Sequence, residues 1–84
     1  MNTKFHEVTT ITAESDALFL IVDGQAYRVK WEDCSPRLAE ASPTERAYIE
    51  VSPSGYGLYW ALLDEDLAVA PLLEKAAAVS META

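Results

Sequence analysis

The dipeptide Asp23-Gly24 constrains the fold of this chain more than any other feature of its sequence. It separates two runs that are rich in β-branched and aromatic residues, Ala17 to Val22 and Gln25 to Trp31. Asp-Gly favours a two-residue type I′ turn, because both turn positions require a positive φ. We therefore predict a β-hairpin in which Val22 pairs with Gln25.

This register assigns each side chain of the hairpin to one of two faces, since successive side chains of a strand point to opposite sides. The predicted core face contains the cross-strand pairs Leu18 with Val29 and Leu20 with Tyr27. The opposite face is mixed and carries Phe19 and Ile21 beside Arg28 and Lys30. We expect a helix to cover part of this mixed face, or a partner to bind it.

Two further segments have the composition and periodicity of strands. Phe5 to Thr12 is rich in β-branched and aromatic residues, and Ala47 to Val51 alternates with period two. The turn-rich run Ser52 to Gly57 then leads the chain back into Leu58 to Trp60. Together with the hairpin, these segments predict a small antiparallel sheet.

Helix signals occupy the middle and the C-terminal part of the chain. Ser35-Pro36 and Ser42-Pro43 each place a capping serine before a proline, which predicts two short helical turns. Glu45 completes a capping box in the second.

A longer helix is predicted from Leu67 onward, where leucines and alanines have helical spacing over about three turns. Because Pro71 is tolerated only in the first turn, this helix is expected to begin near Ala68, with Asp66 just before it. Residues 80–84 are expected to fray.

The length of 84 residues allows one hydrophobic core. We therefore predict a single α+β domain over residues 1–84, with a small antiparallel sheet built on the N-terminal hairpin and the C-terminal helix packed on it. The lone Cys34 cannot form an internal disulfide, and the N-terminal residues lack a secretion-signal pattern, so we expect a cytoplasmic protein. The longest apolar run before the C-terminal helix, Ala17 to Val22, is far shorter than the roughly 20 residues of a membrane span.

The chain is acidic, with 14 Asp and Glu against 6 Lys and Arg and a formal net charge of −8. This charge opposes direct binding to nucleic acid, because phosphates are also negative. It would attract a basic partner.

Residues able to carry catalysis or hold a metal are scarce. His6 is the only histidine, and with one cysteine the chain cannot supply a clustered set of zinc ligands. A serine or cysteine hydrolase would require His6 to serve Cys34 or a serine across the fold. The glycines form neither a Walker-type nor a dinucleotide motif. We therefore expect no metal, no cofactor and no enzymatic activity.

One segment combines aromatic and acidic residues at high density, and it supplies the candidate partner-binding residues Tyr56, Tyr59, Trp60, Asp64, Glu65 and Asp66. Tyrosine and tryptophan are common interface anchors, and carboxylates pair with lysine or arginine. The alternative interpretation is structural. In it, Trp60 fills the core and the acidic triplet lies at a helix N-terminus, where negative charge complements the helix dipole.

Several short motifs are spread over the chain, namely Pro36-Arg37-Leu38, Ala41-Ser42-Pro43-Thr44-Glu45-Arg46, Gly55-Tyr56-Gly57-Leu58-Tyr59-Trp60, Leu63-Asp64-Glu65-Asp66 and Leu72-Leu73. Together they resemble the motifs of the bacterial domain-of-unknown-function family 2442 (DUF2442). The chain departs from the family pattern at Tyr59, where histidine is common, at Ala61, where proline is common, and at Ala68, where a capping serine is common. The resemblance implies a compact α+β domain of bacterial or phage origin. Because some relatives are encoded beside small toxin-like proteins or joined to helix-turn-helix domains, it also suggests an antitoxin-like or regulatory role.

Four hypotheses for the function follow. The leading one is a non-enzymatic binding or regulatory module, antitoxin-like or an adaptor, that recognises a basic protein. The second is a homodimeric structural module that pairs through an open sheet edge or through Phe19 and Ile21. The third is an enzyme with Asp64 or Glu65 as general base. The fourth is an inhibitor whose carboxylates mimic nucleic-acid charge.

Overall fold

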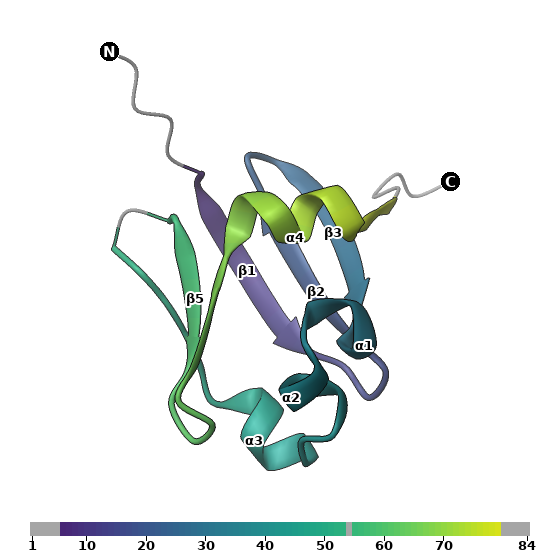
Figure 1. The fold of residues 1–84 in the computed structure, drawn as a ribbon. Coiled ribbons are helices and arrows are strands. Elements are labelled where there is room, and N and C mark those ends of the chain that lie inside the picture. Colours follow the sequence, from purple (N-terminus) through teal and green to yellow (C-terminus); the bar gives the residue numbers. More distant parts are fainter. Residues whose placement is uncertain (1–5, 54, 80–84) are drawn as a thin grey trace.

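Two antiparallel sheets enclose a shared core in the computed structural model, which describes residues 6–53 and 55–79 (Figure 1). The strands are β1 (Val8–Ala13), β2 (Ala17–Val22), β3 (Gln25–Lys30), β4 (Ile49–Val51), β5 (Gly57–Trp60), β6 (Glu65–Ala68) and β7 (Ala77–Val79). The helices are α1 (Trp31–Cys34), α2 (Pro36–Ala39), α3 (Pro43–Ala47) and α4 (Val69–Lys75). The larger sheet has the order β1-β2-β3-β7, and the smaller has the order β4-β5-β6. The predicted α+β class is therefore confirmed.

The predicted hairpin forms between β2 and β3, with Asp23 at φ 53° and Gly24 at φ 82°. Its register is also confirmed, because Val22 pairs with Gln25 and the remaining pairs follow. The Asp23 carboxylate accepts a hydrogen bond from the Glu7 N–H at 2.8 Å and contacts His6 Nδ1 at 2.9 Å. The turn thus also fixes the segment that enters β1.

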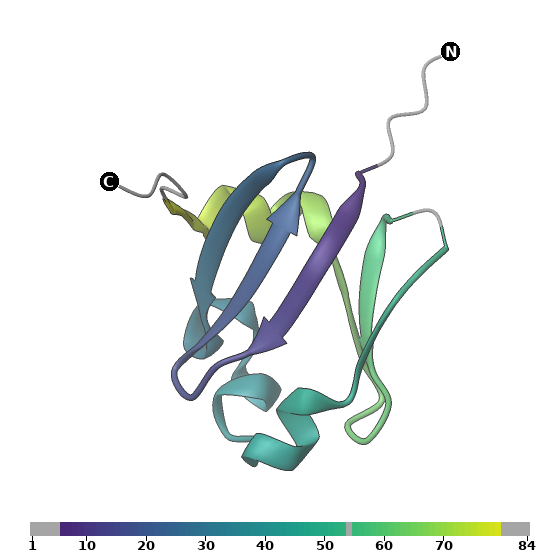
Figure 2. The same ribbon diagram turned by 180° about the vertical axis from the view of Figure 1, so that it is seen from behind.

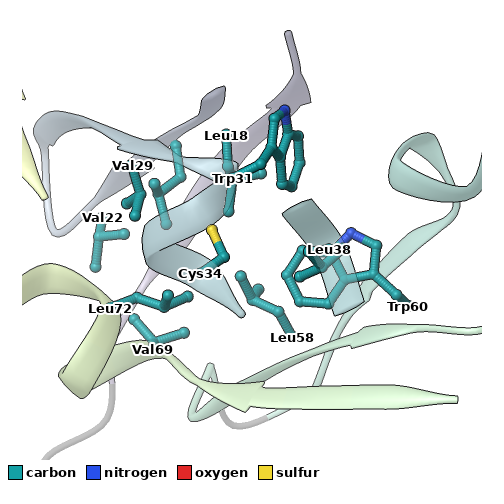
Figure 3. Close-up of a cluster of buried hydrophobic side chains, with 11 residues drawn as sticks. Leu18, Val22, Val29, Trp31, Cys34, Leu38, Leu58, Trp60, Val69 and Leu72 are labelled. Carbon is teal, nitrogen blue, oxygen red and sulfur yellow. The ribbon is translucent and has the colours of Figure 1, made fainter. Parts of the chain in front are cut away.

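The core lies between the two sheets and the helices (Figure 3). Its largest members, Trp31 and Trp60, meet edge to face with ring centroids 6.4 Å apart, a favourable arrangement for aromatic rings. Both indole N–H groups donate to backbone oxygens, that of Trp31 to Glu14 and that of Trp60 to Arg46. The other buried core residues are Leu18, Leu20, Val22, Val29, Cys34, Leu38, Leu58, Val69 and Leu72.

The two predicted helix starts are also present. The Ser35 hydroxyl accepts a hydrogen bond from the Leu38 N–H at the start of α2, and Ser42 and Glu45 form a complete capping box at α3. Helix α1, which begins at Trp31 directly after β3, was not predicted.

Arg46 at the end of α3 connects three parts of the chain. Its guanidinium donates to the carbonyl oxygens of Leu38, Ala39 and Ser15 at 3.0 to 3.1 Å, and it lies over the Trp31 ring at 4.9 Å. It therefore satisfies carbonyl groups at the end of α2 while stacking on the core.

The prediction for the C-terminal part was wrong in two respects. Helix α4 has seven residues, about two turns, because the alanines that follow form β7 and pair with β3. Leu67, the first residue of the predicted helical pattern, belongs to β6. Pairing with an available strand edge has overridden the helix propensity of alanine, which is worth only tenths of a kcal/mol per residue. The start of the helix at Val69 lies one residue from the predicted position.

The first strand differs slightly from its predicted range, since β1 ends at Ala13 and the predicted Phe5 lies outside the described residues. Strand β4 is shorter than predicted, because Ala47 still belongs to α3. The expected fraying of residues 80–84 also falls outside the described part of the chain.

The mixed face of the larger sheet carries no helix among the described residues, and Figure 2 shows this face. Phe19 and Ile21 are half-buried there. The Arg28 guanidinium lies 5.3 Å from the Phe19 ring centroid and is held by the Glu14 carboxylate through bonds of 2.7 and 3.1 Å. A charged side chain thus lies over the apolar ring. In the described part of the chain, no helix is long and apolar enough to cross a membrane.

Candidate functional site

The outer face of the smaller sheet gathers one tyrosine and three carboxylates. Tyr59 lies on the central strand β5, directly opposite Glu50 on β4 and Asp66 on β6. Asp64 lies in the turn before β6, and its Oδ1 accepts a hydrogen bond from the Tyr59 hydroxyl at 3.0 Å. We call these four residues, Glu50, Tyr59, Asp64 and Asp66, the acidic face.

Local structure places these side chains. Leu58 and Trp60 point into the core, so strand alternation turns Tyr59 outward. The turn between β5 and β6 brings Asp64 to φ 52°, in the left-handed region that aspartate tolerates better than most residues. Asp64 is therefore directed back over β5, where it meets the Tyr59 hydroxyl.

The acidic surroundings raise the pKa of Tyr59. The hydrogen bond to Asp64 is the largest cause, followed by the negative charge of Asp64, with smaller effects of desolvation and of the Asp66 and Glu50 charges. The phenol is neutral near neutral pH even at its ordinary pKa, and it donates its hydrogen bond to Asp64. With three carboxylates around it, this face favours a cationic ligand.

Of the predicted site residues, Tyr59, Asp64 and Asp66 lie together on the acidic face, and Tyr56 shares a surface hollow with Asp66. Tyr59 is 36% exposed and Tyr56 is 46% exposed. Tyr56 and Asp66 line one shallow hollow, and Tyr59 and Asp66 line the adjoining one. Asp66 therefore borders both tyrosines.

Trp60 and Glu65 do not join them, which corrects the predicted set. Trp60 is fully buried, and Glu65 lies opposite it on the inner face of the small sheet, 3.8 Å from Arg37 Nε. The reason is strand alternation, since residues adjacent in sequence point to opposite faces. The structural interpretation of Trp60 as a core residue is confirmed.

The structural interpretation of the acidic triplet was wrong. Asp64, Glu65 and Asp66 do not lie at a helix N-terminus, because residues 65–68 form β6 and α4 begins only at Val69. Their charges are therefore not placed to complement the dipole of α4.

Glu50 is the member of the acidic face that was not predicted from the sequence. The period-two pattern of residues 47–51 carried the relevant signal, since it places Glu50 on the face opposite Ile49 and Val51. What the sequence does not show is which strand lies beside it.

The remaining candidate groups lie elsewhere. Burial raises the pKa of the Cys34 thiol to about 12, so it is protonated and poorly nucleophilic near neutral pH. Asp64 and Glu65, the candidate general bases, lie on opposite faces of the small sheet and do not share a cleft. Over residues 6–53 and 55–79, no three His, Cys, Asp or Glu side chains are grouped as metal ligands would be.

The fold and the site together define a small α+β domain with an exposed aromatic and acidic surface on its smaller sheet. The chain belongs to the family described as protein of unknown function (DUF2442), whose model matches residues 8–78. The resemblance inferred from the motifs is thus confirmed over most of the chain. No curated protein and no solved structure matches it.

Proposed function

We propose that this chain is a non-enzymatic binding module, antitoxin-like or an adaptor, that recognises a basic protein through its acidic face. The observation that carries this proposal is the position of Glu50, Asp64 and Asp66 around the exposed ring of Tyr59. Three negative charges on one exposed face favour a cationic group of a partner.

The chemistry of this surface suits a lysine or arginine of the partner. A carboxylate forms charge-assisted hydrogen bonds with either side chain, and a guanidinium can also stack on the Tyr59 or Tyr56 ring. The net charge of −8 adds a long-range attraction that accelerates encounter with a basic protein.

Affinity capture from the source cell tests the proposal with three proteins. The first is the wild type, and the second is the triple variant E50Q/D64N/D66N. The third is a control, E32Q/E40Q/E74Q, which removes the same number of charges from exposed positions elsewhere. We expect the wild type and the control to retain one basic protein in stoichiometric amount, and the face variant to lose it. Absence of any stoichiometric partner at both low and moderate salt would contradict the proposal.

The alternative that the acidic face mimics nucleic-acid phosphates uses the same three carboxylates. The identity of the captured protein distinguishes this alternative from the leading proposal, because the target of a nucleic-acid mimic would itself bind DNA or RNA. Added nucleic acid would displace it from the acidic face, whereas a partner without such affinity would remain bound.

The homodimer alternative receives less support from the mixed face of the larger sheet. Arg28 covers Phe19 there and is itself paired with Glu14, so an interface would require this charged pair to be moved or desolvated. Sedimentation of the wild type at high concentration decides this alternative, and a concentration-dependent dimer would favour it.

A further inference from the structure

Strand β4 forms one edge of the smaller sheet, where it pairs with β5 alone among the described strands. It lies at the rim of the molecule, beyond β5 in both views (Figures 1 and 2). An edge strand presents a row of backbone groups that a further strand can pair with.

The alternation of hydrogen-bonded and non-hydrogen-bonded pairs between β4 and β5 identifies which backbone groups of β4 face outward. The Ser52 N–H donates to the Gly57 carbonyl oxygen at 3.0 Å, so this opposing pair is a hydrogen-bonded one. Bonded and non-bonded pairs alternate in an antiparallel ladder, which makes Glu50 with Tyr59 the next bonded pair. The N–H and C=O groups of Ile49 and Val51 therefore point away from β5, toward the open edge.

The side chains of β4 specify what could lie beside it. Val51 is 38% exposed and shares the inner face of the small sheet with Ile49, whereas Glu50 is on the outer face. No lysine or proline lies within Ile49–Val51, the residues that often protect an edge from pairing. Pro53 and the three-residue length restrict pairing to a short segment.

We propose that β4 binds an extended segment of the basic partner as a fourth strand of the small sheet, with an apolar-basic-apolar pattern. Its backbone bonds to Ile49 and Val51, and its lysine or arginine lies directly opposite Glu50. Two apolar residues of the segment flank this basic residue and contact Ile49 and Val51. This inference rests on the proposed function and specifies the partner segment and the mode of its binding.

The test uses a fluorescently labelled peptide of alternating valine and lysine, and its binding is followed by fluorescence anisotropy at low salt. The matched control is the same peptide N-methylated at the amides that would face β4, which keeps its charge but removes its backbone donors. We expect the methylated peptide to bind roughly tenfold or more weakly, since two hydrogen bonds are lost.

Variants of β4 test the same geometry from the protein side. Val51→Pro removes an outward N–H without affecting the ladder to β5, so it should weaken binding of the peptide by a similar factor. Glu50→Lys should abolish binding of the lysine peptide and favour a peptide with glutamate in its place. If the proline variant fails to fold, amide hydrogen exchange of the wild type still decides. Bound peptide should slow exchange at Ile49 and Val51 and leave Glu50, already bonded to β5, unchanged.

Equal binding of the methylated and unmethylated peptides, or unchanged exchange at Ile49 and Val51, would overturn strand addition. So would absence of peptide binding. In each of these cases the proposed function survives if capture of the basic protein still depends on the acidic face. Loss of that dependence would instead refute the proposed function itself.

Discussion

Tyr59 and Asp64 show at the scale of the residue how a short turn creates a surface with specific electrostatics. The left-handed conformation of Asp64 directs its carboxylate to the phenol of Tyr59. Tyr59, Asp64 and Asp66 could be predicted as candidate site residues because tyrosines and carboxylates are dense in this segment. Trp60 and Glu65 were predicted with them but lie on the inner face, because a dense segment contains both faces of a strand.

Replacement of Asp64 by asparagine should lower the pKa of Tyr59 toward its ordinary value, because the acceptor of its hydrogen bond loses its negative charge and a neutral amide oxygen stabilises the neutral phenol less. Asparagine also tolerates the positive φ of this position. NMR titration of a selectively labelled Tyr59 ring measures the change. Glu40→Gln, which neutralises an exposed acid elsewhere, serves as the control and should leave the pKa of Tyr59 unchanged.

The same shift has a defined sign for stability. A phenol whose pKa is raised in the folded state stabilises the fold fully below its unfolded pKa, and this contribution is lost as pH rises through the folded pKa. Wild-type stability should therefore decline more steeply than that of Asp64→Asn on the alkaline side. A steeper decline in the variant would contradict the assigned cause.

At the scale of the element, structures specified by nearby residues were predicted, whereas strands that depend on distant partners were not. The β2–β3 hairpin and the α3 capping box were predictable, because each is specified by residues within a few positions of one another. Strands β6 and β7 were not, since their sequences carry helix-like or ambiguous signals and their strand form depends on β5 and β3. Glu50 was missed for a related reason, because its neighbours lie on other strands.

The type I′ turn gives a quantitative prediction for the hairpin. Gly24→Ala should lower the free energy of unfolding by about 1–2 kcal/mol, since alanine at a φ of 82° is strained although no atom obstructs its Cβ. Gly57→Ala is a matched control. Its Cβ would meet the Leu67 carbonyl oxygen at an ordinary 3.4 Å, and its φ is not in the left-handed region. Urea denaturation measures the free energy of unfolding of both variants. Equal losses of stability in the two would argue against the turn assignment.

At the scale of the whole molecule, the two tryptophans connect the two sheets through the core. Trp31 follows the larger sheet and Trp60 belongs to the smaller, and the two rings are in contact at the centre of the core. Their burial was foreseeable from size and apolarity, whereas their contact depends on the arrangement of the two sheets.

Trp60→Ala should accordingly cost about 3–5 kcal/mol and destabilise both sheets together. Leu62→Ala, at a residue that is mostly exposed, should change stability by less than about 0.5 kcal/mol. Chemical denaturation followed by circular dichroism and by amide exchange in each sheet gives the comparison. Separate transitions for the two sheets would show that the core does not couple them.

The late position of β7 has a consequence for synthesis on the ribosome. Gln25 at the start of β3 reaches the Val79 carbonyl oxygen, a partner 54 positions further along the chain. The β2–β3 ribbon can form as soon as it leaves the exit tunnel, but the second side of β3 remains bare until Ala77 to Val79 have also emerged. Nascent chains on neighbouring ribosomes of one messenger therefore display the same unpaired strand edge until residues 77–79 have emerged and pair with β3.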